Sequence, residues 1–181
     1  MAVGRVHVGP ALGPRGDLVT TPDLFEPAPP VGVVDVAVVR ERLRLVRDPE
    51  IPTVSIVDLG MVETVEVGQA GIAVELLPTF VGCPAQALIR EAVLDALAPL
   101  GRPVTAEFTF RVPWTSDRIT PLGRERLTSS GFAPPVEPDA VRCPYCASDR
   151  VVMDSAFGPA QCRSLFYCRA CRQPFEAFKP V

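Results

Sequence analysis

The sequence predicts an α+β protein made of a small α-β-β-β-α-β domain followed by a C-terminal zinc ribbon. Three observations predict this fold: two apolar stretches with helical period, four short stretches rich in strand-forming residues, and two Cys-x-x-Cys pairs near the C-terminus. The chain has 181 residues, enough for one full hydrophobic core and one small module. We expect a leader over residues 1–33, the α+β domain over 34–133, a linker over 134–141 and the ribbon over 142–181.

The first half of the α+β domain is predicted to contain one helix and three strands. Asp35 is a plausible N-cap for a helix to Arg47, whose apolar residues recur on one face. The prolines in Asp48–Pro52 end this helix and predict a tight, rigid loop. Strands are expected at Val54–Val57, Val62–Val67 and Ile72–Leu77, and the last two form a hairpin across the glycine-containing turn between them.

The second half is predicted to contain the better of the two helices and a final strand. Leu88–Leu97 has helical period, with Pro84 suited to its first turn and Pro99 marking its end. Val104–Phe110 alternates apolar and polar residues, as a half-buried strand does. A polar helical turn over Ser116–Leu127 closes the domain, and three prolines within five residues indicate the linker.

Composition excludes several classes of protein. The net charge of −3, with 48% hydrophobic and 22% charged residues, is typical of a globular protein rather than a strongly basic nucleic-acid binder. Six of the 21 prolines fall in the first 30 residues, so we expect a flexible Pro/Gly-rich leader. Because this leader has no long apolar run, and no stretch reaches the length of a membrane span, we expect a cytoplasmic protein without membrane partners.

The single histidine, His7, lies in that leader. The folded part therefore has no imidazole for a Ser-His-Asp triad or a Cys-His pair. It also cannot build a histidine-ligated catalytic zinc or a di-iron centre of the Glu-x-x-His type. Direct oxygen chemistry by this chain is therefore the least favoured function.

The two Cys-x-x-Cys pairs form the strongest motif. Cys143 and Cys146 are followed, after a stretch long enough for a hairpin, by Cys168 and Cys171. Two such turns bring four thiolates to one tetrahedral zinc, and closed coordination makes that zinc structural. Disulfides and a rubredoxin-like iron site are the alternatives, and the expected cytoplasmic setting disfavours disulfides.

The charge of the ribbon bears on its partner. Residues 134–181 carry six basic and five acidic side chains, and four thiolates with one zinc add further negative charge. Because phosphate binding requires clustered Lys and Arg, this balance argues against nucleic acid and favours docking to a protein.

A second candidate site centres on Cys83. Its place between Gly82 and Pro84 predicts a thiol at the N-cap of the following helix, where the helix dipole favours the thiolate. Thr79 lies nearby in the sequence, and Asp48 and Glu50 supply carboxylates on the rigid loop. The alternatives are an ordinary buried cysteine and solvated loop carboxylates.

Cys162 lies between the two Cys-x-x-Cys pairs. On an extended strand it would share a face with Cys168 but lie roughly 20 Å away, so it is not expected to share that zinc. It is interpreted either as a small buried apolar residue or as an additional cysteine with a second metal or thiol role.

Several of these motifs together resemble the MIP18 family, also called the domain of unknown function 59 group, whose members act in iron–sulfur cluster assembly. The resemblance covers about residues 35–133 and is carried by Asp48–Pro52, Val57–Val62, Pro78–Phe80, Gly82–Pro84 and Pro113–Asp117. The ribbon narrows it to one subfamily, the accessory components of phenylacetyl-CoA epoxidase complexes, through Ser155–Gly158, Gln161–Cys168 and Gln173–Lys179.

This resemblance implies roles for individual residues. The cysteine at the position of Cys83 is implicated in cluster or metal transfer, and Cys162 matches a cysteine of the subfamily. Related members often end in Phe-Lys-Cys, whereas this chain ends Phe178-Lys179-Pro180-Val181, so a site that uses a tail cysteine is not expected. The resemblance implies two possible clients, a reductase with an iron–sulfur cluster and an oxygenase with a di-iron centre.

The leading hypothesis is therefore an accessory maturation factor, not itself an enzyme, that passes iron or an iron–sulfur cluster through Cys83 and docks its client with a structural zinc ribbon. Because one thiol cannot hold a cluster alone, we expect a homodimer or ligands shared with a partner. The alternatives are a non-catalytic adaptor that stabilises the oxygenase complex and a zinc-ribbon regulator that binds nucleic acid.

Overall fold

The computed structural model describes residues 34–181, which belong to one compact unit. The expected leader and His7 lie outside the described residues. Among the described residues, no helix is long and apolar enough to cross a membrane.

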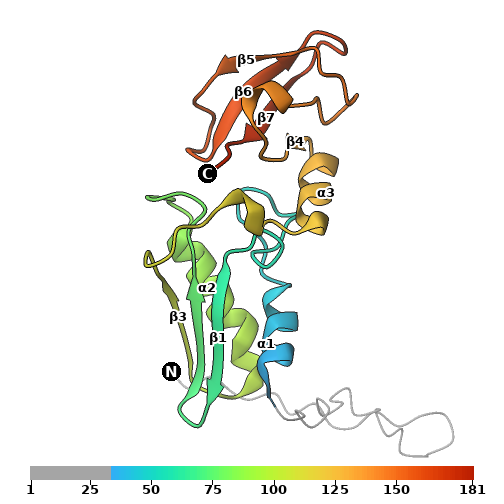
Figure 1. The fold of residues 1–181 in the computed structure, drawn as a ribbon. Helices are drawn as coiled ribbons and strands as arrows, with labels where there is room; N and C mark the ends of the chain where they lie inside the picture. The colour runs from blue at the N-terminus through green and yellow to red at the C-terminus, as the bar shows by residue number, and fades with distance from the viewer. Residues whose placement is uncertain (1–33) are drawn as a thin grey trace, which may run out of the picture. The chain divides into compact units, whose positions relative to one another are not determined.

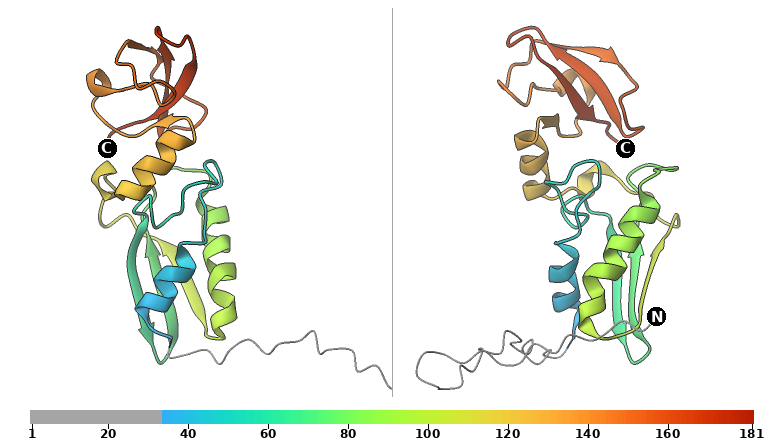
Figure 2. Two further views of the ribbon diagram at one scale, coloured as in Figure 1. Left: turned by 90° about the vertical axis from the view of Figure 1, so that its right-hand side faces the viewer. Right: turned by 180° about the vertical axis from the view of Figure 1, so that it is seen from behind.

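The first half of the described chain forms a three-stranded sheet with two helices on one face (Figure 1). Strands β1 and β2 form an antiparallel hairpin, as expected, and β3 pairs in parallel with β2 after the crossover through α2. Viewed from behind in Figure 2, α2 covers the sheet and α1 lies beside it. The elements are α1 (Val36–Leu43), β1 (Val62–Gly68), β2 (Gly71–Leu76), α2 (Gln86–Leu97) and β3 (Val104–Phe108).

Helix α1 begins where the sequence predicts but ends earlier. The Asp35 carboxylate accepts a hydrogen bond from the backbone N–H of Val38 at 2.9 Å, which confirms the predicted N-cap. The helix ends at Leu43 rather than Arg47. The chain leaves the helix because Val46 is buried in the core and its carbonyl accepts a hydrogen bond from Ile56 at 3.0 Å.

The strand predicted at Val54–Val57 is wrong, so the order of this domain is α-β-β-α-β. The Ser55 hydroxyl donates to the Asp58 carboxylate at 2.8 Å and accepts from the Asp58 backbone N–H at 3.0 Å. These local bonds stabilise a turn, which polar side chains offer as an alternative to a strand. One isolated bridge, between Arg47 and Ser55, is all the pairing that remains of the expected strand.

Asp58 connects this turn to two helices. Its carboxylate is only 2% exposed and lies 2.5 Å from Arg126 of α3 (Pro121–Ser129) and 3.7 Å from Arg44 at the end of α1. A buried carboxylate requires such partners. Asp58 is therefore a structural residue that holds the turn against α1 and α3.

Gly60 and Trp114 also fix the loop between α1 and β1 in place. Gly60 has φ +67°, and a Cβ there would lie 2.4 Å from the carbonyl oxygen of Arg118, so another residue would force the two segments apart. The Trp114 indole donates to the Leu59 carbonyl at 2.8 Å. The loop between α1 and β1 is thus held from several sides.

The last part of the chain forms a second sheet, of order β4-β7-β6-β5. Its strands are β4 (Phe132–Ala133), β5 (Val151–Ser155), β6 (Arg163–Cys168) and β7 (Pro174–Phe178). It has its own small core, in which the rings of Phe166 and Phe175 stack with centroids 5.7 Å apart. This is the architecture of a zinc ribbon, as the sequence predicts.

Two predicted boundaries shift. The polar helical turn over Ser116–Leu127 consists of the 3₁₀ turn η2 (Ser116–Arg118) followed by α3, which begins after the N-cap Thr120. The strand predicted to Phe110 ends at Phe108, and the Phe110 side chain is 60% exposed.

Candidate functional site

The four ribbon cysteines converge on one point. Their sulfur atoms all lie within 4.8 Å of one another, with Cys143 3.6 Å from Cys171 and Cys146 3.7 Å from Cys168. A metal bound to four thiolates at about 2.3 Å places the sulfurs about 3.8 Å apart. We call these four residues the ribbon tetrad, and its geometry is that of a tetrahedral metal site.

The backbone around the ribbon tetrad favours thiolates unequally. Backbone N–H groups of Cys171 and Ala170 lower the pKa of the Cys168 thiol to about 6. Burial and the neighbouring thiols raise the pKa of Cys171 to about 12. Because metal ligation requires thiolates, loading of the tetrad releases the protons that these thiols still hold.

The carboxylate loop that precedes β1 is as rigid as its prolines predict. The Asp48 carboxylate accepts hydrogen bonds from the backbone N–H groups of Glu50 at 2.8 Å and Ile51 at 2.9 Å. Burial raises the pKa of this carboxyl, and the two hydrogen bonds counteract that effect. Asp48 therefore holds the loop's shape, and Glu50 next to it stays exposed.

Cys83 lies on the loop before α2 rather than at its N-cap. Ala85 occupies the N-cap, with no side-chain bond to the helix. The thiol is half-buried, and its burial raises its pKa despite the backbone N–H of Ala85. The negative charges of Glu50 and Asp48 raise it further. The expected stabilisation of the thiolate by the helix is thus outweighed, and the free thiol stays protonated at neutral pH.

Cys162 comes from the ribbon but does not join the ribbon tetrad. It directly precedes β6, is half-buried, and packs against the core of the first domain, as Cys83 does. Burial raises the pKa of its thiol from 9.0 to about 11, which Arg163 opposes and which Glu50, Cys83 and Asp48 increase. The same two carboxylates therefore act on both thiols.

The negative charges of Asp48 and Glu50 raise the pKa of both thiols, and we call Cys83, Cys162, Asp48 and Glu50 the thiol–carboxylate cluster. In residues 34–181 the ribbon tetrad is the one group of three or more such residues whose ligand atoms lie close enough to hold one ion. The ligand atoms of the thiol–carboxylate cluster therefore do not lie close enough for three of them to hold one ion.

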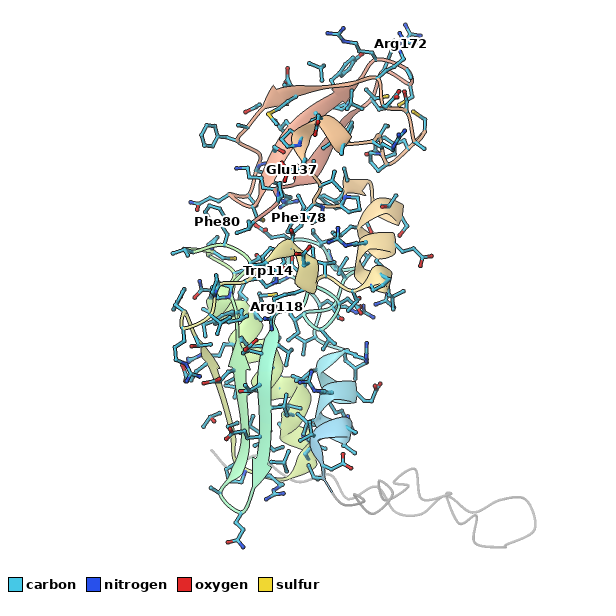
Figure 3. All side chains as sticks on the ribbon, viewed as in Figure 1. Phe80, Trp114, Arg118, Glu137, Arg172 and Phe178 are labelled. Atoms are coloured by element: carbon cyan, nitrogen blue, oxygen red, sulfur yellow. The ribbon has the colours of Figure 1, made fainter. Side chains whose placement is uncertain are left out.

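Thr79 lies on the loop between β2 and α2. Its side chain is 7% exposed and lines a surface cavity of about 270 Å³ together with apolar neighbours. Phe80 and Trp114, labelled in Figure 3, belong to this lining. Cys83 is not among the residues that line this cavity, so the cavity does not join Thr79 to the thiol.

Sequence reasoning missed Arg163. This residue is 6% exposed, and its guanidinium lies 3.3 Å from Glu50, 2.9 Å from Glu176 and 5.3 Å from the centre of the Phe132 ring. The one available signal was its position just before the largely apolar stretch Leu165–Cys168, because an arginine that is buried there needs acidic partners.

Comparison with known proteins divides the chain into the same two parts, the first sheet with its helices and the ribbon. A family model for iron–sulfur cluster assembly proteins matches residues 37–108, and a model for the PaaD zinc beta ribbon domain matches residues 129–179. The chain is 39% identical over 147 residues to a subunit of the "Putative 1,2-phenylacetyl-CoA epoxidase" of Escherichia coli K12, covering 77% of this chain and 89% of that protein. The chain belongs to the PaaD family.

Two solved structures are similar to part of this PaaD-family chain. A domain of unknown function 59 from Bacillus anthracis is 25% identical, with a TM-score of 0.46, over 49% of this chain and 87% of its own. A conserved hypothetical protein from Thermotoga maritima is 28% identical, with a TM-score of 0.46, over 52% of this chain and 94% of its own.

The two family models divide the candidate residues. Asp48, Glu50, Thr79 and Cys83 fall within the matched assembly segment, and the ribbon tetrad and Cys162 fall within the matched PaaD ribbon. The thiol–carboxylate cluster therefore draws residues from both parts of the PaaD-family chain.

Proposed function

We propose that this chain is an accessory maturation factor of a phenylacetyl-CoA epoxidase, acting in the cytoplasm and not itself the oxygenase. It takes up iron or an iron–sulfur cluster at Cys83 and passes it to a client protein of the epoxidase system. The observation that carries this proposal is a half-buried thiol beside two carboxylates, inside a segment that matches iron–sulfur assembly proteins.

The chemistry of Cys83 suits a transient ligand. Its raised pKa keeps the empty thiol protonated, so uptake of iron exchanges a proton for the metal and release restores the proton. A single thiolate with carboxylate neighbours binds iron less firmly than a closed four-thiolate site. This difference lets the cargo leave for a client that offers more ligands.

Asp48, Glu50 and Thr79 have supporting roles in this proposal. Asp48 holds the loop through its two backbone hydrogen bonds, so that Glu50 is placed to offer an oxygen ligand to incoming iron. Thr79 lies on the same loop between β2 and α2 as Cys83 and lines an apolar cavity, and we expect it to shape the approach to that thiol.

The ribbon tetrad holds a structural zinc in this account, and the ribbon docks the client. The clients are the oxygenase component, the reductase component or both. Because the cargo needs more ligands than Cys83 supplies, we expect the remaining ligands to come from a second copy of the chain or from the client.

The test is epoxidase activity in cells that lack the native gene and carry either the wild type or Cys83→Ser. We expect activity with the wild type and its loss with Cys83→Ser. Gln86→Ser is the matched control, because Gln86 is also half-buried and lies three residues away on the same segment. Full activity with Cys83→Ser would overturn the transfer role and favour an adaptor that only stabilises the oxygenase complex.

A further inference from the structure

Exposed arginines surround the metal-binding end of the ribbon. Arg142, Arg169 and Arg172 are each direct neighbours in the sequence of a tetrad cysteine, and the four tetrad sulfurs lie within 4.8 Å of one another. Arg150 joins them, because its carbonyl accepts a hydrogen bond from the backbone N–H of Arg169 at 2.8 Å. All four side chains are exposed. We call Arg142, Arg150, Arg169 and Arg172 the arginine collar.

The fold does not use the charges of the arginine collar. Within residues 34–181, none of its four guanidinium groups forms an ion pair. Arg142 donates a weak hydrogen bond to the Ala147 carbonyl at 3.5 Å. Six arginines elsewhere in the described chain each pair with a carboxylate: Arg44, Arg90, Arg111, Arg118, Arg126 and Arg163. The collar therefore presents its positive charge to solvent.

Arg172 occupies a backbone position that favours a different residue. Its φ is +61°, in the left-handed region typical of glycine, and its N–H donates to the Cys168 carbonyl at 2.9 Å to close the turn. Ala147 has the corresponding position after Cys146, with φ +58°. The turn itself thus needs no long side chain. The Arg172 side chain lies at the outer end of the ribbon in Figure 3, where a contact outside the chain would explain an arginine.

Exposed tyrosines lie among these arginines. Tyr145 lies between the first two tetrad cysteines, and Tyr167 directly precedes Cys168. Arginine and tyrosine are enriched at the centres of protein–protein interfaces, where lysine is depleted. The one lysine of the chain, Lys179, lies at the other end of the ribbon, where its backbone N–H donates to the Cys162 carbonyl. The collar therefore has the composition of a protein-binding surface.

The charge of this end of the ribbon indicates the kind of protein. In residues 142–150 and 168–173, Asp149 is the one acidic side chain beside the four arginines. The tetrad thiolates with their zinc add negative charge, so the excess of positive charge is too small for a dense phosphate backbone. Each guanidinium can still bind one carboxylate through two hydrogen bonds. The collar therefore fits Asp and Glu side chains of a protein better than it fits nucleic acid.

The arginine collar is separate from the contact between the ribbon and the first domain. Strand β6 runs from Arg163, which pairs with Glu50 of the first domain, to Cys168 of the tetrad. The collar thus lies at the end of the ribbon away from that ion pair, and a partner can bind it without disturbing the carboxylate loop.

We propose that the arginine collar is the surface through which the ribbon docks an acidic segment of the client protein. This inference rests on the proposed function, and it names the docking surface and the chemistry of the client segment that binds it. The client segment presents Asp and Glu side chains to the guanidinium groups, and the exposed tyrosines pack against its apolar atoms.

The test measures binding of the zinc-loaded full chain to the purified oxygenase and reductase components of the epoxidase system, at low and at physiological salt. Arg169→Gln/Arg172→Gln removes two charges of the collar. Arg40→Gln/Arg42→Gln is the matched control, because both residues are exposed arginines of α1 without ion pairs in the described chain. The two variants change the net charge equally. Zinc content and hydrogen exchange of the ribbon strands verify that each variant is folded.

We expect the wild type and the control to bind at least one component with affinities within about twofold, and the collar variant to bind about tenfold more weakly, because two charged hydrogen-bonded pairs are lost. Salt should weaken binding by the wild type more than binding by the collar variant. Cys83→Ser should bind as the wild type does. Equal affinities of the wild type and the collar variant would overturn this inference and leave the transfer role of Cys83 intact, because epoxidase activity tests that role.

Two other outcomes would also overturn the inference. Collar-dependent binding of an oligonucleotide, without such binding to either component, would make nucleic acid the partner. No binding of either component by the wild type would overturn the docking role of the ribbon as a whole.

A second measurement identifies the charge of the partner. Arg172→Lys keeps the positive charge and adds a lysine to a chain that otherwise has Lys179 alone. A carbodiimide joins a lysine amine to a carboxylate as an amide, and the water that is lost converts the reagent to a urea. We expect a crosslink between position 172 and an Asp or Glu of the client, located by peptide mapping, and no such link at position 40 in Arg40→Lys. Absence of a link at position 172, while Arg172→Lys still binds the client, would contradict the proposed surface.

Discussion

The ribbon tetrad and the thiol–carboxylate cluster use the same residue type in different surroundings. In the tetrad, two sulfur pairs lie 3.6 and 3.7 Å apart, and the pKa is lowered to about 6 at Cys168 but raised to about 12 at Cys171. In the cluster, burial and nearby carboxylates raise the pKa of both thiols. The four converging sulfurs of the tetrad suit permanent metal binding, whereas the cluster suits uptake and release. The difference teaches that surroundings decide what a cysteine does with a metal.

The largest expected effect follows removal of a tetrad ligand. We expect Cys146→Ser to lose zinc and the ribbon to unfold, because zinc contributes on the order of 10 kcal/mol to the folding of such small modules. Zinc content and amide hydrogen exchange of the ribbon strands measure this. The comparison variant Cys162→Ser is expected to keep its zinc and its protected strands; equal loss of zinc in both variants would mean that the two sites are not separate.

A smaller effect is expected when the ion pairs of Arg163, which join the ribbon to the carboxylate loop, are removed. Arg163→Gln leaves Glu50 and Glu176 without their cation, and we expect a loss of about 2 kcal/mol, below that of a fully buried pair because both glutamates are partly exposed. Urea unfolding of zinc-loaded protein measures the change. Arg150→Gln, at an exposed ribbon arginine, is the control and is expected to change stability by less than about 0.5 kcal/mol.

The raised pKa of Cys162 predicts a pH dependence of its alkylation. With a pKa of about 11 rather than 9.0, its thiolate fraction at pH 8 is about a hundredth of that of an ordinary cysteine. Iodoacetamide labelling of zinc-loaded protein, followed by mass spectrometry, should therefore accelerate as the pH rises toward 11. Labelling at pH 8 as fast as in urea would show that the thiol is not protected.

The raised pKa of Cys162 also makes the stability of the fold depend on pH. The folded chain holds the Cys162 proton more tightly than the unfolded chain does. The resulting contribution to the free energy of unfolding is present below about pH 9 and is lost as the pH rises through about 11.

The smallest effect is expected at the start of α1, where neither cysteine site is involved. Asp35→Ala removes the N-cap bond to Val38 and should destabilise the chain by about 1 kcal/mol. Thermal unfolding measures this, and zinc content should stay unchanged. A change in zinc content would mean that the ribbon tetrad depends on this helix more than the structure indicates.

The sequence predicts those features that depend on local spacing. The N-cap at Asp35, the hairpin of β1 and β2, and the ribbon tetrad all follow from residues a few positions apart or from paired motifs. The strand expected at Val54–Val57 fails because the bonds between Ser55 and Asp58 compete with strand pairing.

The features that sequence reasoning missed depend on long-range packing. Nothing local indicates that Cys162 packs against the core of the first domain, or that Arg163 reaches Glu50, because these contacts form only after both domains fold. The N-cap expected for Cys83 fails for a related reason: the chain around Pro84 starts the helix two residues later, and burial then determines the pKa of the thiol.

The central claim is that Cys83 handles iron while the ribbon tetrad holds zinc. The most direct measurement is the zinc, iron and acid-labile sulfide content of anaerobically purified wild type and Cys83→Ser. The account predicts one zinc per chain in both, with iron and sulfide in the wild type alone. Equal iron and sulfide in both proteins, or none in either, would contradict it.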